Sequence, residues 1–240
     1  PPVITLETGT TLPPGDTTAT TEAGSTDTTE AAATTTEGPT TTVARTFTFG
    51  NGPCPAEDGS STLPEKPEAP KLCIDPAKTY TATVETNKGE FTMELNTALA
   101  PGNVNNFVTL ARFGYYTDST CHRVLTDFVV QCGRPKGDPS VTETKPGYTV
   151  ADELPAPDSY RDAVVAIANT GQPDSGSGQW FIITGSQGAA LPPSYTVLGK
   201  VTSGFDTTVK VLAGLADPLA ENGTPPLSPI DIVKVTITES

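Results

Sequence analysis

Residues for metal, phosphate and hydrolytic chemistry are largely missing from this chain. Its 240 residues include a single histidine, His122, and four cysteines without a C-x-x-C pair. Zinc sites use closely spaced Cys and His ligands, so zinc is the weaker explanation of the four cysteines. The sequence also lacks a Gly-rich phosphate loop, a nucleophile elbow, an H-E-x-x-H motif and partners for a Ser-His-Asp triad. We therefore expect neither a metal nor a cofactor.

Positive charge is scarce as well. The chain has 14 Lys and Arg against 28 Asp and Glu, a net charge of −14, without a basic cluster. Such a chain is repelled by nucleic-acid phosphates and by anionic lipid surfaces. No run approaches the roughly 18 apolar residues that a membrane-spanning helix needs. We expect no nucleic-acid partner and no direct membrane insertion.

The N-terminal segment lacks what a folded core requires. Residues 1–42 contain 17 Thr and six acidic residues but no Lys, Arg or aromatic residue. Such a segment buries too little apolar surface to offset the entropy lost on ordering, which predicts a disordered Thr/Pro-rich linker. A tether is one interpretation and a tail without function the other. The chain begins Pro1-Pro2 without a methionine or signal-like segment, so we expect that an N-terminal anchor to membrane or cell wall has been removed.

Cysteines mark the next segment. Residues 43–78 form a Pro-rich extension in which Cys54 and Cys73 lie 19 residues apart. A disulfide is most useful where a segment has little core of its own, which predicts the pair Cys54–Cys73. Cys121 and Cys132 bracket two short runs that could form a hairpin, so a second disulfide is expected there if the geometry allows. An even cysteine count and a tether favour an oxidising, extracytoplasmic location.

The pattern of a folded domain begins at residue 79. Apolar and polar residues alternate over 80–85 and 91–95 around Asn87-Lys88-Gly89, which indicates a hairpin. Helical spacing follows over 101–114 and again over 206–213. Short β-rich runs occupy 122–125, 128–131, 163–168, 180–184, 196–201 and 230–238. Many short strands with only two helices predict a mainly β fold, a closed antiparallel barrel, over residues 79–240.

Five ordered segments resemble the cyclophilin family of peptidyl-prolyl cis/trans isomerases. They are V-N-N-F at 104–107, H-R-V at 122–124, F-V-V-Q at 128–131, A-N-T-G at 168–171 and G-Q-W-F-I at 178–182. The resemblance extends from residue 79 to the C-terminus and is closest to bacterial, actinobacterial-like extracytoplasmic members. It implies an eight-stranded β-barrel capped by two α-helices, in agreement with the pattern above.

The resemblance also implies a site. An X-Pro bond rotates over a barrier of about 20 kcal/mol, and its nitrogen recovers a lone pair in the twisted state. A guanidinium that donates a hydrogen bond to that nitrogen stabilises the transition state selectively, and Arg123 is the candidate. The family's catalytic residues map onto Arg123, Gln131 and Phe128. Its substrate-binding residues map onto Val129, Ala168, Asn169, Gln179, Phe181, Leu191 and Tyr195.

Three residues need separate treatment. His122 is interpreted as a hydrogen-bonded core residue, because the reaction transfers no proton and neighbouring strand residues face opposite sides. Trp180 is placed in the core by the same alternation. Ala190 stands where cyclosporin-sensitive members of the family usually carry tryptophan, which predicts weak cyclosporin binding.

The sequence thus predicts a monomeric isomerase that binds Pro-containing segments of exported proteins and assists their folding. The alternative is a module that binds proline peptides without useful turnover. A third hypothesis has the extension packing across the groove, with Pro64, Pro67 and Pro70 as pseudo-substrates.

Overall fold

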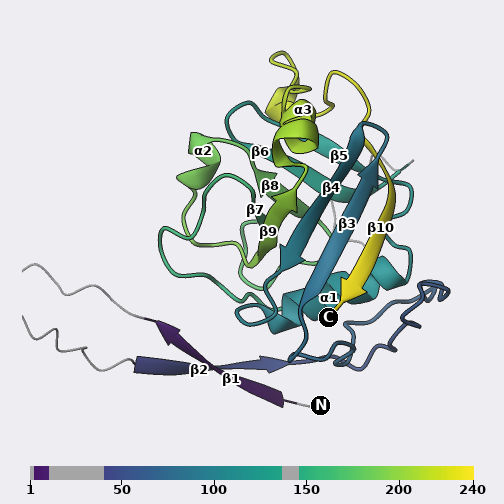
Figure 1. Cartoon of the computed structure of the whole chain (residues 1–240), viewed down its shortest axis with the longest axis vertical. Helices are drawn as coiled ribbons and strands as arrows, with labels where there is room; N and C mark the ends of the chain where they lie inside the picture. Colours follow the sequence, from purple (N-terminus) through teal and green to yellow (C-terminus); the bar gives the residue numbers. More distant parts are fainter. Residues whose placement is uncertain (1–2, 11–40, 137–145) are drawn as a thin grey trace, which may run out of the picture.

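A closed eight-stranded barrel forms the body of the molecule (Figure 1). The computed structural model describes residues 3–10, 41–136 and 146–240. Around the barrel the strands follow the order β10-β3-β4-β9-β7-β8-β6-β5, and β10 pairs again with β5. Every strand pair is antiparallel, which confirms the predicted fold class. The strands are β3 (Tyr80–Thr86), β4 (Gly89–Leu95), β5 (Ser119–Val124), β6 (Val129–Pro135), β7 (Val164–Ile167), β8 (Trp180–Ile183), β9 (Val197–Ser203) and β10 (Asp231–Glu239).

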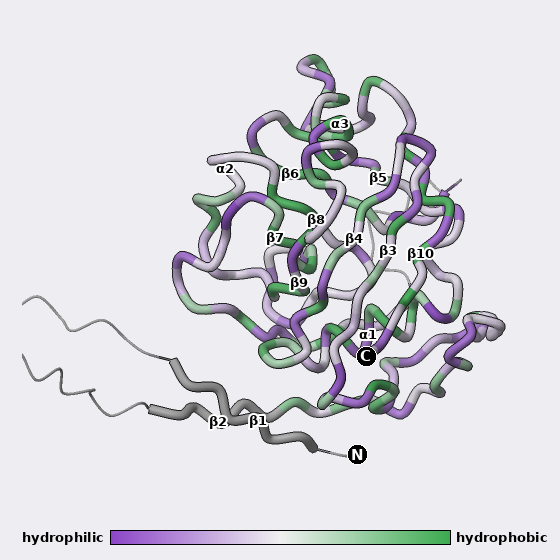
Figure 2. The backbone as a smooth tube through the Cα atoms, in the orientation of Figure 1, coloured by the Kyte–Doolittle hydropathy of each residue, from purple (hydrophilic) through white to green (hydrophobic). Residues whose placement is uncertain are grey.

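Alternation of side chains explains the first hairpin. Tyr80, Ala82 and Val84 of β3 are buried, whereas the threonines between them are partly exposed. This two-residue period places one face of the strand in the core. Gly89 closes the turn with a φ of +130°, a conformation that side chains disfavour. Figure 2 shows the resulting mixture of apolar and polar residues along β3 and the more uniformly apolar colours around β8.

Helices cover the two ends of the barrel (Figure 1). Helix α1 (Pro101–Arg112) begins with proline at its first position, where the missing N–H is not needed. At the other end, a π-helical turn η1 (Phe205–Val209) continues into α3 (Lys210–Ala213), which confirms the helix predicted over 206–213. Two short helices were not predicted, α2 (Ser186–Ala189) and the 3-10 turn η2 (Glu221–Gly223).

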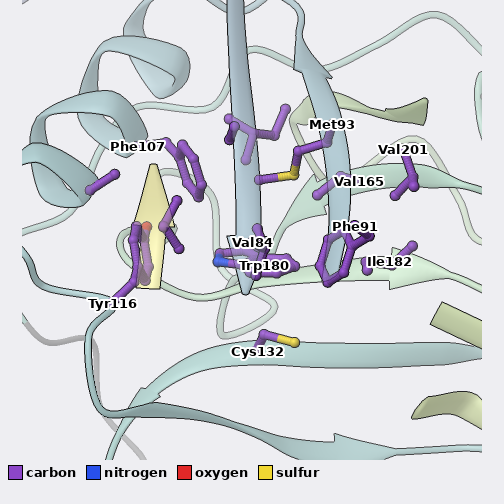
Figure 3. Packing of buried hydrophobic residues seen from close by; sticks show 14 of the residues in the cluster. Val84, Phe91, Met93, Phe107, Tyr116, Cys132, Val165, Trp180, Ile182 and Val201 are labelled. Carbon is purple, nitrogen blue, oxygen red and sulfur yellow. The ribbon is translucent and has the colours of Figure 1, made fainter. Parts of the chain in front are cut away.

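Aromatic rings fill the interior beneath α1 (Figure 3). Trp180 is 0% exposed, as predicted, and its ring centroid lies 6.3 Å from those of Phe91 and Phe107. Phe107 also lies 5.0 Å from Tyr116. The two contacts of Trp180 are edge-to-face, and such pairs stabilise a core beyond the area that they bury. The strands that carry the candidate site therefore rest on a rigid interior.

The extension packs against the outer side of α1. Asn105 accepts a hydrogen bond from the backbone N–H of Cys73 at 2.7 Å and donates one to the carbonyl of Lys71 at 2.9 Å. The ring of Phe47 occupies the space that a side chain at Gly102 would need. The predicted disulfide Cys54–Cys73 is present. All twelve residues of α1 are buried, and the extension covers part of the helix.

Two strands lie outside the barrel. β1 (Val3–Thr10) pairs antiparallel with β2 (Thr41–Thr48), with Val3 opposite Thr48 and Thr10 opposite Thr41. This pairing differs from the disordered linker predicted over 1–42. Composition predicts little burial for this segment, but Thr, Val and Ile also favour extended strands. The rest of that predicted linker, 11–40, lies outside the described residues, and the domain boundaries stay predictions.

Within the described residues, no helix combines the length and apolar character needed to cross a bilayer.

Candidate active site

A groove of about 100 Å³ lies on the outer face of the barrel, over β6 and β8. It is lined by nine residues that the sequence analysis assigned to the site: Arg123, Phe128, Val129, Gln131, Ala168, Asn169, Phe181, Leu191 and Tyr195. The tenth, Gln179, reaches the groove through a contact with Gln131. The barrel thus brings together residues from positions 123 to 195 of the chain.

A chain of hydrogen bonds organises the polar side of the groove. Arg123 on β5 lies opposite Gln131 on β6, and its Nη1 donates to Gln131 Oε1 at 3.3 Å. Gln131 Nε2 donates in turn to Gln179 Oε1 at 2.9 Å. The guanidinium carbon of Arg123 lies 5.6 Å from the ring centroid of Phe128, within cation–π range. These contacts hold a cation beside an apolar wall.

Asn222 holds the other side of the guanidinium. Its side-chain oxygen accepts from Arg123 Nη2 at 2.8 Å and from Nε at 3.3 Å, and its backbone carbonyl accepts from Nε at 3.1 Å. A guanidinium has five N–H groups, and the contacts with Gln131 and Asn222 use three of them. Burial lowers the pKa of Arg123, but an arginine keeps its charge near neutral pH. The cation is therefore fixed, with two N–H groups left for a further partner.

Sequence reasoning missed Asn222. It lies in η2, 99 residues from Arg123, with a φ of +52°. The Asn-Gly dipeptide at 222–223 is a turn signal, but nothing in it predicts which side chain the turn approaches.

Aromatic residues form the apolar side. The rings of Phe181 and Tyr195 meet edge-to-face with centroids 5.3 Å apart. Tyr160, also missed by the sequence analysis, fixes the backbone of Tyr195. Its hydroxyl donates to the Tyr195 carbonyl at 2.6 Å and accepts from the Tyr195 N–H at 2.9 Å. Both backbone polar groups of Tyr195 are therefore hydrogen-bonded to the Tyr160 hydroxyl.

Asn169 connects two loops at the rim of the groove. Its side-chain nitrogen donates to the Ser194 carbonyl at 2.9 Å, and its oxygen accepts from the Gly171 N–H at 3.0 Å. The side chain is therefore engaged within the protein. Ala190, which ends α2, is exposed beside Leu191 at the same rim.

His122 differs from the expected core histidine. β5 carries a bulge between Cys121 and Arg123, so strict alternation fails there. Cys121 is buried in the barrel, whereas Arg123 lines the outer groove and His122 is partly exposed. Its Nδ1 has no hydrogen-bond partner among the described residues. Burial, followed by the positive charge of Arg134, lowers the pKa of His122 to about 4, so the ring is neutral at neutral pH.

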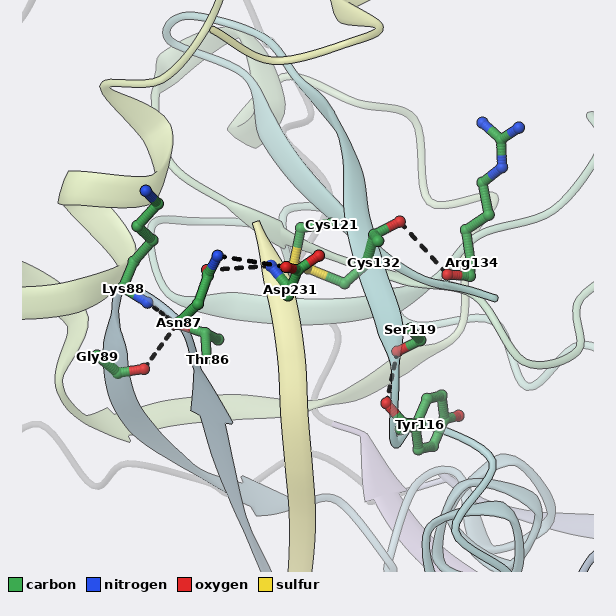
Figure 4. Close-up of a disulfide and its surroundings, with 11 residues drawn as sticks. Thr86, Asn87, Lys88, Gly89, Tyr116, Ser119, Cys121, Cys132, Arg134 and Asp231 are labelled. Carbon is green, nitrogen blue, oxygen red and sulfur yellow. Dashed lines mark hydrogen bonds between the residues drawn. A yellow bond between two sulfur atoms is a disulfide. The ribbon is translucent and has the colours of Figure 1, made fainter. Parts of the chain in front are cut away.

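The second predicted disulfide, Cys121–Cys132, is present beside the groove (Figure 4). Both cysteines are 0% exposed and face one another across β5 and β6. Gln131 directly precedes Cys132 in the sequence, and Arg123 follows Cys121 by two residues. The covalent link therefore joins the two strands that carry the guanidinium and its glutamine partner.

The extension does not cover the groove. None of its described residues, 47–78, lines the site. Pro64 and Pro67 instead share a small pocket with Leu110 and Phe113, and Pro70 lies close to Gly102. The hypothesis that these prolines act as pseudo-substrates is therefore wrong, because all three lie beside α1 and none lines the groove.

Among the described residues, no group of three or more His, Cys, Asp or Glu side chains is placed to hold a metal ion.

Comparison with known proteins agrees with this geometry. The family described as "Cyclophilin type peptidyl-prolyl cis-trans isomerase/CLD" matches residues 81–237. The chain is 34% identical over 201 residues to the "Probable peptidyl-prolyl cis-trans isomerase B" of Mycobacterium tuberculosis, which covers 77% of this chain and 61% of that relative. It therefore spans less than two thirds of that relative's length. It is also 39% identical over 129 residues to a peptidyl-prolyl cis-trans isomerase of Helicobacter pylori, covering 53% of this chain and 76% of that protein.

Solved structures give the same result. A Cryptosporidium parvum cyclophilin type peptidyl-prolyl cis-trans isomerase superposes with a TM-score of 0.58 and 26% identity, covering 68% of this chain and 99% of that one. The same protein crystallised in the presence of the dipeptide Ala-Pro gives a TM-score of 0.57 at 26% identity, with coverage of 67% and 99%.

Proposed function

The chain belongs to the cyclophilin-type peptidyl-prolyl cis-trans isomerase family, and from this premise we propose that it interconverts cis and trans X-Pro bonds. One observation carries the proposal: the Arg123 guanidinium is fixed by Gln131 and Asn222 beside the apolar wall of the groove. A fixed cation next to an apolar pocket suits a proline ring and the nitrogen within it.

The proposed mechanism needs no covalent intermediate. Resonance keeps the X-Pro bond planar, and rotation removes that resonance, so the nitrogen becomes a hydrogen-bond acceptor only in the twisted state. An N–H of Arg123 directed at this nitrogen stabilises the transition state and leaves the ground state unaffected. Because Gln131 and Asn222 already orient the guanidinium, little reorganisation is required during rotation.

The remaining groove residues have binding roles in this proposal. Phe128, Phe181 and Leu191 contact the proline ring, and Val129 and Ala168 complete the apolar surface. Gln131 and Gln179 hold the peptide backbone by their amides. Asn169, whose side chain is occupied, contributes its backbone groups.

We further propose that the substrates are exported proteins and that the chain works outside the cytoplasm, as a monomer tethered at its N-terminus. Two disulfides support this location, since structural disulfides persist in oxidising compartments. Binding of Pro-containing peptides is supported by the related structure crystallised in the presence of the dipeptide Ala-Pro.

Isomerisation of a short X-Pro peptide at low temperature tests the activity, because uncatalysed exchange takes tens of seconds or more. We expect strong catalysis by the wild type and a loss of about 100-fold or more in Arg123→Ala. Arg134→Ala is the matched control, because Arg134 lies on β6 outside the groove and its variant should keep full activity. A folded wild type that binds the peptide without accelerating exchange would instead support a binding module.

A further inference from the structure

A second, roomier cleft lies away from the groove. It measures about 530 Å³ and opens over β4 and β9, between the turn 96–99 and the loop 155–161. Val164 and Val197 contribute apolar surface, and the side chain of Leu99 is 43% exposed at its edge. An open cleft with an apolar floor is shaped for an extended peptide segment.

Its charge is opposite to that of the molecule as a whole. Lys78, Arg161 and Lys200 line the cleft with only one carboxylate, Glu94, whereas the chain as a whole carries two acidic residues for each basic one. Lys78 is paired with Glu239 at 2.7 Å. Within the described part of the chain, Arg161 and Lys200 form neither an ion pair nor a side-chain hydrogen bond. Two exposed cations in a cleft attract carboxylates more strongly than the same charges on a flat surface.

The cleft and the groove lie along one face of the barrel. Val197 lines the cleft, and Tyr195, two residues earlier, lines the groove. Val164 of the cleft packs in the same apolar cluster as Phe181 and Val129 of the groove. At their nearest the two sites are thus two residues, about 7 Å of extended backbone, apart. A few more residues of peptide are needed to reach the cations, so the expected spacing between proline and carboxylate is about three to six residues.

We infer that this cleft, defined by Lys78, Arg161 and Lys200, binds an acidic segment of the same polypeptide whose proline occupies the groove. The inference rests on the proposed function and adds a substrate preference to it: prolines with Asp or Glu about three to six residues away are favoured. Carboxylates of the segment pair with Arg161 and Lys200, while its apolar side chains contact Val164 and Leu99. Because this contact is remote from the rotating bond, it lowers KM and leaves kcat unchanged.

The test compares peptides that differ only in charge. Each carries one X-Pro bond and either Glu-Glu or Gln-Gln four and five residues away, on the N-terminal or the C-terminal side, beside a short uncharged peptide. In low salt we expect kcat/KM for the Glu peptide to exceed that for the Gln peptide by about threefold to tenfold on one side. The advantage should appear in KM and disappear at 1 M salt.

Two double variants separate the cleft from general charge. Arg161→Gln/Lys200→Gln should abolish the Glu advantage. Lys66→Gln/Lys234→Gln, which removes the same charge from exposed positions outside the cleft, should keep it. Both variants should turn over the short peptide at the wild-type rate. Equal rates for Glu and Gln peptides on both sides, or an advantage that survives in the cleft variant, would overturn the inference.

The two proposals fail separately in this design. If the wild type does not turn over the short peptide, the proposed function is wrong. Binding of the labelled Glu and Gln peptides, measured by fluorescence anisotropy with the same variants, then tests the proposed role of the cleft independently of turnover. Tighter binding of the Glu peptide that is lost only in Arg161→Gln/Lys200→Gln supports it, and equal binding of both peptides contradicts it.

Discussion

Single residues determine how well the guanidinium of Arg123 is oriented. Gln131 was predicted from its motif, but Asn222 was not, although it forms the shortest hydrogen bond to Arg123, at 2.8 Å. Gln131 lies opposite Arg123 because of the strand register, which the sequence pattern predicts. Asn222 lies in a loop, and the position of that loop depends on the whole fold. Residues that act through loops are the ones that a single sequence predicts least well.

Asn222 should be a positioning residue for catalysis. Asn222→Gly removes the side chain but tolerates the φ of +52°, so it avoids the strain that alanine would add. We expect kcat to fall about tenfold with KM and the melting temperature nearly unchanged. Asn222→Asp, which keeps the acceptor oxygen, should restore most of kcat. An unchanged kcat in Asn222→Gly would show that Gln131 and the backbone carbonyl of residue 222 suffice to orient the guanidinium.

His122 predicts a dependence of stability on pH. Its pKa is lowered to about 4 in the folded chain and lies near 6.5 when unfolded. The stability associated with the neutral ring is therefore fully present above pH 6.5. It is lost as the pH falls towards 4, because over this range only the unfolded chain takes up the proton. Over this range the free energy of unfolding should fall by up to about 3 kcal/mol.

Denaturant unfolding of wild type and His122→Gln between pH 7.5 and 4 measures this effect, and the variant should lack it. Hydrogen bonds from Lys78 and Arg112 lower the pKa of Glu239 to about 2, so this group also loses stability below about pH 4.5. Because both proteins carry Glu239, its effect cancels in the comparison. If the free energy of unfolding changed with pH equally in the two proteins, its pH dependence would not come from His122.

At the scale of the elements, periodicity predicted all eight strands of the barrel, α1 and the α3 region to within a few residues. Strong alternation, as in β3 and β4, and a proline at the start of α1 are local signals that tertiary packing reinforces. The bulge in β5 and the short turns α2 and η2 were missed, since they depend on contacts made by residues distant in sequence. That bulge also breaks the alternation from which the inward placement of His122 was predicted.

The two disulfides should differ in what they contribute. Cys121→Ala/Cys132→Ala and Cys54→Ala/Cys73→Ala open loops of 11 and 19 residues, so each should lower the free energy of unfolding by about 3 kcal/mol. Only the first pair joins the strands that carry Arg123 and Gln131. We expect its removal to reduce kcat severalfold at a temperature where the protein stays folded, and removal of the second to leave kcat intact. Equal kcat values in both variants would show that the barrel alone fixes the strands.

At the scale of the whole molecule, the extension belongs to the folded body. Lys78, at its end, pairs with Glu239 of β10 at 2.7 Å, and Arg112 of α1 pairs with the same carboxylate at 2.8 Å. Extension, helix and last strand thus meet at one point. The sequence predicted the Cys54–Cys73 link but not the surface it docks on, because the polar Asn105 gives no sign that it will be buried.

Truncation tests this organisation. Deleting residues 1–46 should leave stability unchanged, whereas deleting 1–78 exposes α1 and should lower the free energy of unfolding by several kcal/mol. Neither deletion should raise kcat, because the extension lies outside the groove. Thermal unfolding and short-peptide kinetics on the two truncations measure both effects. An increase in kcat on deleting 1–78 would restore the idea of a regulatory extension.

The central claim is that the Arg123 guanidinium acts on the twisted X-Pro bond and contributes little to ground-state binding. The most direct measurement is magnetisation exchange by NMR on a short Ala-Pro peptide, which gives the exchange rate and the Kd for the wild type and Arg123→Lys. Lysine keeps the charge but lacks the planar donor geometry. We predict a loss of about 100-fold or more in the catalysed rate, with Kd changed by less than about threefold. A parallel loss of rate and affinity, or a fully active lysine variant, would contradict it.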